Sequence, residues 1–159
     1  MWFSGRLPYG LKRPLNPERD MPFTLECLVD LEELDAQHRY FITLIERIDT
    51  STKTSGTKER ARLVAEVIRY ATFHFACEDA LMTAYGYPGA EHRREHEELL
   101  RKVREMEQNS ELKMSALRLF LYRWLVDHIQ LTDRDLASFV RDRRQEVFTG
   151  ESPLEPRNS

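Results

Sequence analysis

Apolar residues recur at the three- and four-residue spacing of amphipathic helices from about residue 30 to about residue 147, and no segment alternates apolar and polar residues for long. Three interruptions divide this stretch: the Ser-, Thr- and Gly-rich segment 49–57, the Tyr-Gly-Tyr-Pro-Gly segment 85–89, and a weaker break around 109–110. Glycine tends to end a helix, and proline restricts the residue before it. The pattern therefore predicts four helices, at roughly 31–49, 58–85, 90–108 and 111–146.

Short connections between long helices favour antiparallel neighbours. We therefore expect an all-α protein, an antiparallel up-down-up-down four-helix bundle spanning residues 30–147. Residues 1–29 are expected to form an N-terminal arm, and residues 148–159 a flexible C-terminal tail. Asp30 is expected to cap the first helix, with Glu33 completing a capping box three residues later.

Three of the four helices carry a histidine on their apolar face. The predicted faces are Leu34, His38, Phe41 and Ile45 in the first helix, Val67, Ala71, His74, Glu78 and Leu81 in the second, and Leu117, Leu121, Trp124, His128 and Leu131 in the fourth. Imidazoles inside an apolar stripe need polar partners, so these positions are candidates for chemistry.

Composition narrows the classes of function. A chain of 159 residues with 41% hydrophobic and 32% charged residues suits a single globular domain. The net charge of −3 offers no basic field, so nucleic acid is not expected as a partner. No apolar run approaches the roughly 20 residues that span a bilayer, and the N-terminus lacks a signal-peptide core, so we expect a cytoplasmic protein without membrane insertion. Cys27 and Cys77 are expected to be reduced thiols.

The five histidines of the chain all lie in the predicted helices. His92 and His96 are four residues apart, so both rings can reach one metal ion from one helical face. The same spacing joins a histidine to a carboxylate in the HFACE segment (His74 and Glu78), and His38 stands alone in the first helix. In the fourth helix His128 is followed by Asp133 five residues later.

Each of these features alone fits an ordinary core histidine or a solvated charged face. Together they use every histidine in the chain, and each predicted helix contributes at least one. Burying five imidazoles and two carboxylates without partners would cost several kcal/mol per charge. The combination therefore predicts a metal cluster.

The number of ligands favours two metal ions over one. Seven protein ligands exceed the four that a structural zinc takes. If Glu78 and Asp133 both bridge a pair of six-coordinate metals, and one oxygen is shared, a single position stays open. One vacancy beside a metal pair suits reversible binding of a small diatomic ligand.

The strings LDAQH, HFACE, YGYPGAEHRREH and WLVDHIQLTD, spread over about residues 30–140, closely resemble hemerythrins, in particular the single-domain bacterial type. The resemblance implies two iron ions (Fe2+/Fe3+) with a bridging oxo or hydroxo group. It implies that His92, His96 and His128 bind the saturated iron, that His38 and His74 bind the iron with the vacancy, and that Glu78 and Asp133 bridge the two.

The family pattern also favours Asp133 over Asp135 as the second bridge. Five residues of an ideal α-helix leave Asp133 about 140° away from His128, whereas Asp135 would face the same way as His128. We therefore expect a π-type bulge or a local unwinding between residues 128 and 133.

The activity implied by the resemblance is reversible dioxygen binding for storage, delivery or sensing, not catalysis. Large apolar residues next to the ligands are candidates for the oxygen pocket, although each is equally compatible with ordinary core: Phe41, Phe75, Trp124, Leu125 and Ile129. The alternatives are a di-iron redox enzyme (oxidase, peroxidase or nitric-oxide-reducing protein) and an iron sensor or storage protein. Paired Glu-x-x-His motifs, typical of di-iron carboxylate enzymes, are not correctly placed here. We expect a monomer, with a homodimer possible through the amphipathic stretch after Asp135.

Two features depart from the common pattern. They are the N-terminal arm and Cys77, which stands between His74 and Glu78. We expect Cys77 to be a small packed residue.

Overall fold

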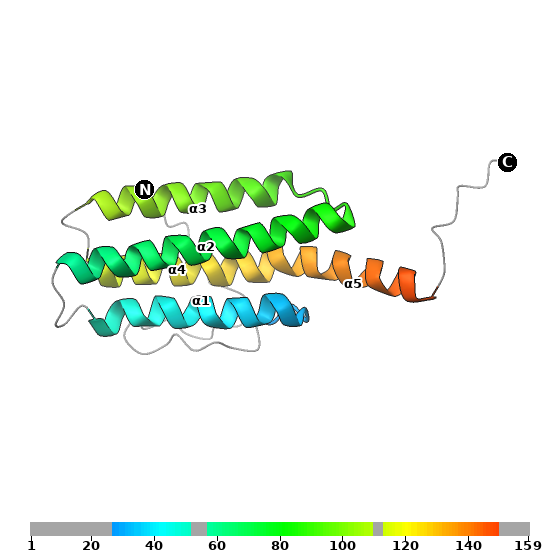
Figure 1. Ribbon diagram of the computed structural model, residues 1–159, viewed down its shortest axis with the longest axis horizontal. Coiled ribbons are helices and arrows are strands. Elements are labelled where there is room, and N and C mark those ends of the chain that lie inside the picture. The colour runs from blue at the N-terminus through cyan, green and yellow to red at the C-terminus, as the bar shows by residue number, and fades with distance from the viewer. Residues whose placement is uncertain (1–26, 52–56, 110–112, 150–159) are drawn as a thin grey trace.

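The computed structural model describes residues 27–51, 57–109 and 113–149. Its elements are α1 (Glu32–Ser51), α2 (Thr57–Tyr85), α3 (Ala90–Gln108), α4 (Met114–His128), the π-helix η2 (Ile129–Asp133) and α5 (Arg134–Thr149). Figure 1 shows α4, η2 and α5 as one continuous rod, and the chain direction alternates from each rod to the next. The predicted all-α, up-down-up-down bundle is confirmed. Most of the expected arm (1–26) and tail (150–159) lies outside the described residues.

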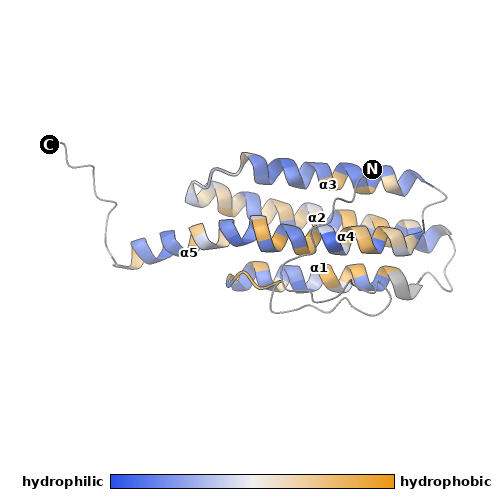
Figure 2. Cartoon of the chain, turned by 180° about the vertical axis from the view of Figure 1, so that it is seen from behind, coloured by the Kyte–Doolittle hydropathy of each residue, from blue (hydrophilic) through white to orange (hydrophobic). Residues whose placement is uncertain are grey.

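Hydrophobic and hydrophilic residues lie on different sides of each helix (Figure 2), and the apolar sides meet inside the bundle. The largest fully buried side chains come from all four rods: Leu34, Phe41, Ile42, Ile45, Ile48, Met82, Leu99, Leu117, Leu121, Leu125, Ile129 and Leu136. Burying one such side chain stabilises the fold by roughly 1.5–3 kcal/mol. Among the described residues, no helix is long and apolar enough to cross a membrane.

The first helix starts differently from the expectation. The carbonyl of Leu31 accepts the first helical hydrogen bonds, from the N–H groups of Leu34 (3.0 Å) and Asp35 (2.8 Å), so Leu31 is the capping residue. Asp30 precedes it with a φ of 58°, and the prediction that Asp30 caps the helix is wrong. Val29 and Leu31 are both buried, and Asp35 Oδ1 accepts the N–H of Val29 at 2.8 Å. Packing on either side of Asp30 therefore sets where the helix begins.

The predicted apolar stripe of the fourth helix fails at one position. Leu131 is 69% exposed, although Leu117, Leu121 and His128 are buried as expected. Leu131 lies inside η2, where the wider π turn changes which face a residue occupies. The regular α-helical period that predicts Leu131 on the apolar face does not hold across the π turn.

The turn between α2 and α3 depends on two glycines. Gly86 adopts a φ of +71°, and the N–H of Tyr87 donates to the carbonyl of Met82 at 2.8 Å, which closes the C-terminus of α2. A Cβ atom on Gly89 would lie 2.1 Å from the sulfur of the buried Met82. This close approach brings the start of α3, and with it His92, against the end of α2.

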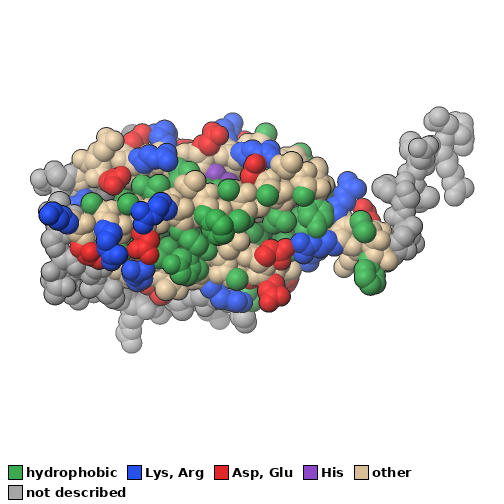
Figure 3. Space-filling view, in the orientation of Figure 1, with side chains coloured by type: hydrophobic (Ala, Val, Ile, Leu, Met, Phe, Trp, Pro, Cys, Tyr) green, Lys and Arg blue, Asp and Glu red, His purple; other side chains and the backbone are tan. Residues whose placement is uncertain are grey.

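An aromatic cluster reaches the surface over α1 and α2, where Figure 3 shows hydrophobic side chains on the outer face. The ring of Tyr70 lies 4.6 Å from that of Tyr40 and 5.9 Å from that of Phe73, measured between centroids. The Tyr70 hydroxyl donates to the carbonyl of Gln37 at 3.1 Å. These contacts tie α1 to α2 next to the buried histidines.

Candidate metal centre

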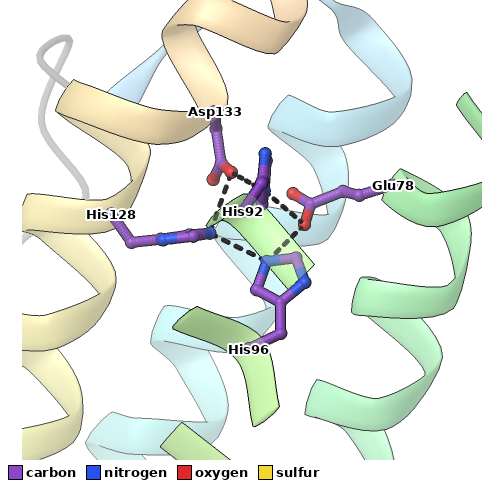
Figure 4. Close-up of side chains that lie close together, drawn as sticks. All are labelled: Glu78, His92, His96, His128 and Asp133. Carbon is purple, nitrogen blue, oxygen red and sulfur yellow. Dashed lines mark hydrogen bonds and ion pairs between the residues drawn. The ribbon is translucent and has the colours of Figure 1, made fainter. Parts of the chain in front are cut away.

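Seven titratable side chains from all four rods converge in the middle of the bundle. They are His38 from α1, His74 and Glu78 from α2, His92 and His96 from α3, His128 from α4 and Asp133 from η2. Each of these residues is at most 5% exposed. The structure thus brings together all seven residues that the sequence analysis proposed as metal ligands, and Figure 4 shows five of them pointing toward one another.

Glu78 divides its two oxygens between two sets of histidines. Its Oε1 lies 3.1 Å from Nε2 of His74 and 3.9 Å from Nε2 of His38. Its Oε2 lies 3.0 Å from Nε2 of His96 and 3.5 Å from Nε2 of His92. One carboxylate therefore faces both sets.

Asp133 repeats this division from the other side of the cluster. Its Oδ2 lies 3.1 Å from Nε2 of His38, whereas its Oδ1 lies 3.2 Å from Nε2 of His92 and 3.1 Å from Nε2 of His128. We call His38 and His74, with the oxygens that face them, the two-histidine group. His92, His96 and His128 with theirs form the three-histidine group. Each group gathers enough ligand atoms to hold one metal ion.

The π turn explains how Asp133 reaches the cluster. Residues 129–133 form η2, and within it Asp133 is fully buried while Asp135, just beyond, is exposed. The predicted distortion between residues 128 and 133 is confirmed. A π turn gives residues five apart nearly the same face of the helix.

A metal ion fits the cluster because its polar atoms lack other partners. Among the described residues, every buried side-chain nitrogen or oxygen without a hydrogen-bond partner belongs to five of the seven: His38, His74, Glu78, His92 and Asp133. Leaving such atoms unpaired is costly in a protein interior. Imidazole nitrogens and carboxylate oxygens are suitable donors for first-row transition metals, iron included.

Without a metal, the cluster pairs protonated histidines with the carboxylates. Burial disfavours the charged form of His38, but the nearby carboxylates of Asp133 and Glu78 outweigh it and raise the pKa of His38 to about 9. The pKa of His92 is raised to about 9 in the same way. Burial lowers the pKa of His96, despite its contact with Glu78.

The pKa values of the two carboxylates are shifted downward, opposite to those of His38 and His92. Burial favours the neutral acid, yet the charge of His74 and the nearby imidazole of His38 hold the pKa of Glu78 well below its usual range. Burial and the neighbouring Glu78 also oppose ionisation of Asp133, but His128 and His38 keep the pKa of Asp133 below its usual range. Both carboxylates are therefore ionised and available to cations.

The sequence analysis did not identify the residues that accept hydrogen bonds from the Nδ1 atoms of the histidines, on the side of the ring away from the cluster. Gln37 Oε1 accepts the Nδ1–H of His74 at 2.8 Å. Glu95 Oε2 accepts the Nδ1–H of His128 at 2.7 Å and the hydroxyl of Thr132 at 2.9 Å. Gln37 and Glu95 each directly precede a histidine of the cluster in the chain, and the sequence holds no other signal for them.

The candidate pocket residues are placed unevenly around the cluster. Phe75 stacks on His96 with centroids 3.7 Å apart, and Trp124 stacks on His128 at 4.4 Å. Phe41 meets the edge of His74 at 6.1 Å. Leu125 and Ile129 are fully buried in α4 and η2.

Comparisons with known proteins agree with this geometry. Residues 29–140 match the family model described as the hemerythrin HHE cation binding domain. A bacteriohemerythrin of Stenotrophomonas maltophilia (strain R551-3) is 32% identical over 117 residues, which cover 71% of this chain and 76% of that protein. A bacteriohemerythrin of Pseudomonas aeruginosa (strain LESB58) is 28% identical over 126 residues, covering 77% and 82%. The crystal structure of a wild-type hemerythrin superposes with a TM-score of 0.65 at 22% identity, covering 70% and 90%.

Proposed function

The chain belongs to the hemerythrin family, and from that premise we propose that it binds dioxygen reversibly at two iron ions. The observation that carries the proposal is the way Glu78 and Asp133 each give one oxygen to the two-histidine group and one to the three-histidine group. Carboxylates in this position can bridge two metals.

The two groups differ in their number of ligand atoms, which supports different roles for the two iron ions. The three-histidine group, with its two carboxylate oxygens, offers one ligand more than the two-histidine group. We therefore assign the saturated iron to His92, His96 and His128, and the iron with an open position to His38 and His74. When bound, a pair of ferrous ions would supply one electron each to a dioxygen molecule.

The protein's own contribution is to hold the ligands and to keep water away. The aromatic rings of Phe75 and Trp124 cover imidazoles of the three-histidine group, and Phe41 lies against His74 of the other. Apolar surroundings slow the loss of electrons to solvent-borne oxidants and stabilise a neutral diatomic ligand. We assign Phe41, Phe75, Trp124, Leu125 and Ile129 to the pocket that surrounds the oxygen site.

Binding, not catalysis, is the function that this ligand set supports. Five histidines outnumber two carboxylates, whereas di-iron oxygen-activating bundles use a carboxylate-rich set. Oxygen storage, delivery and sensing are the roles that such binding serves, in a monomer or a homodimer.

The deciding experiment is an absorption spectrum of the protein loaded with ferrous iron under nitrogen, recorded before air is admitted, in air, and after degassing. We expect about two irons per chain and a charge-transfer band in the visible region that appears with air and disappears on degassing. Irreversible oxidation at the first exposure would instead indicate a di-iron redox enzyme or an iron sensor.

A further inference from the structure

Glu95 accepts two hydrogen bonds from the rod that carries Asp133. Its Oε2 accepts the Nδ1–H of His128 at 2.7 Å and the hydroxyl of Thr132 at 2.9 Å. His128 is the last residue of α4, and Thr132 lies inside η2. A single carboxylate oxygen on α3 is thus bonded to both the residue before the π turn and a residue within it.

The hydrogen bond from His128 to Glu95 determines which ring nitrogen of His128 is directed toward the cluster. A carboxylate can only accept, so the hydrogen of a neutral His128 ring sits on Nδ1 and its Nε2 lone pair is left for the cluster, where Nε2 of His96 lies 2.9 Å away. Trp124 stacks on the same ring at an interplanar angle of 16°. The ring is held in orientation by Glu95 at its edge and by Trp124 on its face.

The second bond acts on the turn itself. The residue after Thr132 is Asp133, which faces both groups of the cluster. Because Glu95 bonds to Thr132 and to His128 together, it stabilises the π geometry that delivers Asp133. An α-helical turn here would turn Asp133 away from the site.

The two-histidine and three-histidine groups also differ in the charge of the residue that accepts a hydrogen bond from a histidine Nδ1. His74 donates to the neutral amide oxygen of Gln37 in the two-histidine group, whereas His128 donates to the anionic Glu95 in the three-histidine group. An anionic acceptor raises the basicity of an imidazole ligand and so favours the more highly charged metal ion.

We infer that Glu95 is a positioning residue of the metal centre, which orients His128, holds the π turn that presents Asp133, and stabilises ferric iron in the three-histidine group. The inference rests on the proposed di-iron function. It assigns to Glu95 a preference between oxidation states that Gln37 does not supply to the other group.

The test compares Glu95→Gln with the matched control Glu98→Gln, which removes the same charge from the same helix. Glu98 is exposed and pairs with Lys102 at 3.0 Å on the surface. Both variants are loaded with ferrous iron under nitrogen. The rate at which a chelator removes the iron and the reduction midpoint potential are then measured. No dioxygen is used, so the outcome does not depend on whether the chain binds it.

We expect Glu95→Gln to lose one iron about tenfold faster than Glu98→Gln, in line with the 10- to 100-fold effects of such partners in other metal sites. The midpoint potential should rise, and a tenfold change in the ferric preference corresponds to about 59 mV for a one-electron couple. Equal rates and equal potentials in the two variants would overturn the inference.

Thr132→Val separates the geometric role from the charge. This substitution removes the hydrogen bond from the Thr132 hydroxyl to Glu95 but keeps the hydrogen bond between His128 and Glu95. We expect faster iron loss with an unchanged midpoint potential. A potential shifted as far as in Glu95→Gln would show that charge is not the cause, and unchanged iron loss would show that Glu95 does not hold the turn.

Discussion

Oδ1 of Asp133 lies 3.1 Å from Nε2 of His128, although the two residues are five positions apart in one continuous rod. In an ideal α-helix this separation would leave them about 140° apart. The π turn η2 removes that difference and places Asp133 beside Glu78 at the centre of the bundle.

Asp133→Asn should therefore remove one of the two bridging carboxylates that we propose. We expect iron bound per chain to fall from about two to one or fewer, because an amide is a poor bridging ligand. Colorimetric iron analysis after gel filtration measures this directly. Asp135→Asn is the matched control, since Asp135 is exposed on the same rod. Full loading of Asp133→Asn, or loss of iron in Asp135→Asn, would contradict the assignment.

Ile129 tests the apolar pocket. The side chain is fully buried, so Ile129→Thr would place a hydroxyl in surroundings that Ile129→Val leaves apolar at nearly the same volume. We expect the threonine variant to autoxidise several-fold faster than the valine variant, because a polar group admits water and protons. The decay of the oxygenated absorption band gives both rates. If the two rates agree, Ile129 does not line the oxygen site.

The pH dependence of metal binding follows from the histidines. With pKa values of about 9, His38 and His92 are protonated at pH 7 in the metal-free protein, and a metal ion must displace these protons. Apparent affinity should therefore rise with pH up to about 9. Calorimetry at pH 7 in two buffers of different ionisation enthalpy should reveal the release of about two protons. Binding without proton release would refute the protonated resting state.

The metal-free protein should show the opposite trend in stability. Raised histidine pKa values mean that His38 and His92 contribute stability below their unfolded pKa of about 6.5, and that this contribution is lost as pH rises through about 9. The lowered pKa values of Glu78 and Asp133 contribute stability that is lost in acid. Urea unfolding of the metal-free protein should give its highest stability near pH 5–6.5, and a maximum above pH 9 would contradict this.

Cys77 should be dispensable for the redox behaviour of the centre. Its thiol is free and half-buried, whereas the neighbouring Glu78 of the cluster is fully buried. Cys77→Ala is expected to leave the autoxidation rate within about twofold of the original, since small packed residues rarely alter a site that they do not touch. A larger change, measured beside the distant control Cys27→Ala, would show that the thiol influences the cluster.

The sequence was most informative where a residue type was scarce. Five histidines at helical spacings, with Glu78 and Asp133, were enough to propose the seven ligands, because imidazoles on apolar faces have few other uses. The expectation of a π turn needed the resemblance to hemerythrins as well, because helical spacing by itself favours Asp135 over Asp133. The end of α2 and the start of α3 lie where they were predicted, because Gly86, Pro88 and Gly89 mark that turn. The last rod, which was predicted at 111–146, begins and ends three residues later, at Met114 and Thr149.

What the sequence could not reveal depended on tertiary contacts. Glu95 looks like one more acid on a highly charged helix, and only the approach of α4 and η2 makes it a partner of His128. Leu131 was predicted to be buried because α-helical spacing places it on the apolar face, but it lies in the π-helix η2, where that spacing does not hold. Asp30 looked like a cap, but burial of Leu31 decided the helix start.

The π turn also has a consequence for comparing relatives. Beyond it, Leu136, Ala137 and Val140 are fully buried. Because a π turn takes up about one residue more than an α-helical turn, an uninterrupted α-helix with the same residues would rotate each of these side chains by about 100° from its present direction. The turn thus behaves as a one-residue insertion absorbed within η2. A relative with a straight helix would be expected to differ by a single gap between positions 128 and 133, with every later core position still aligned.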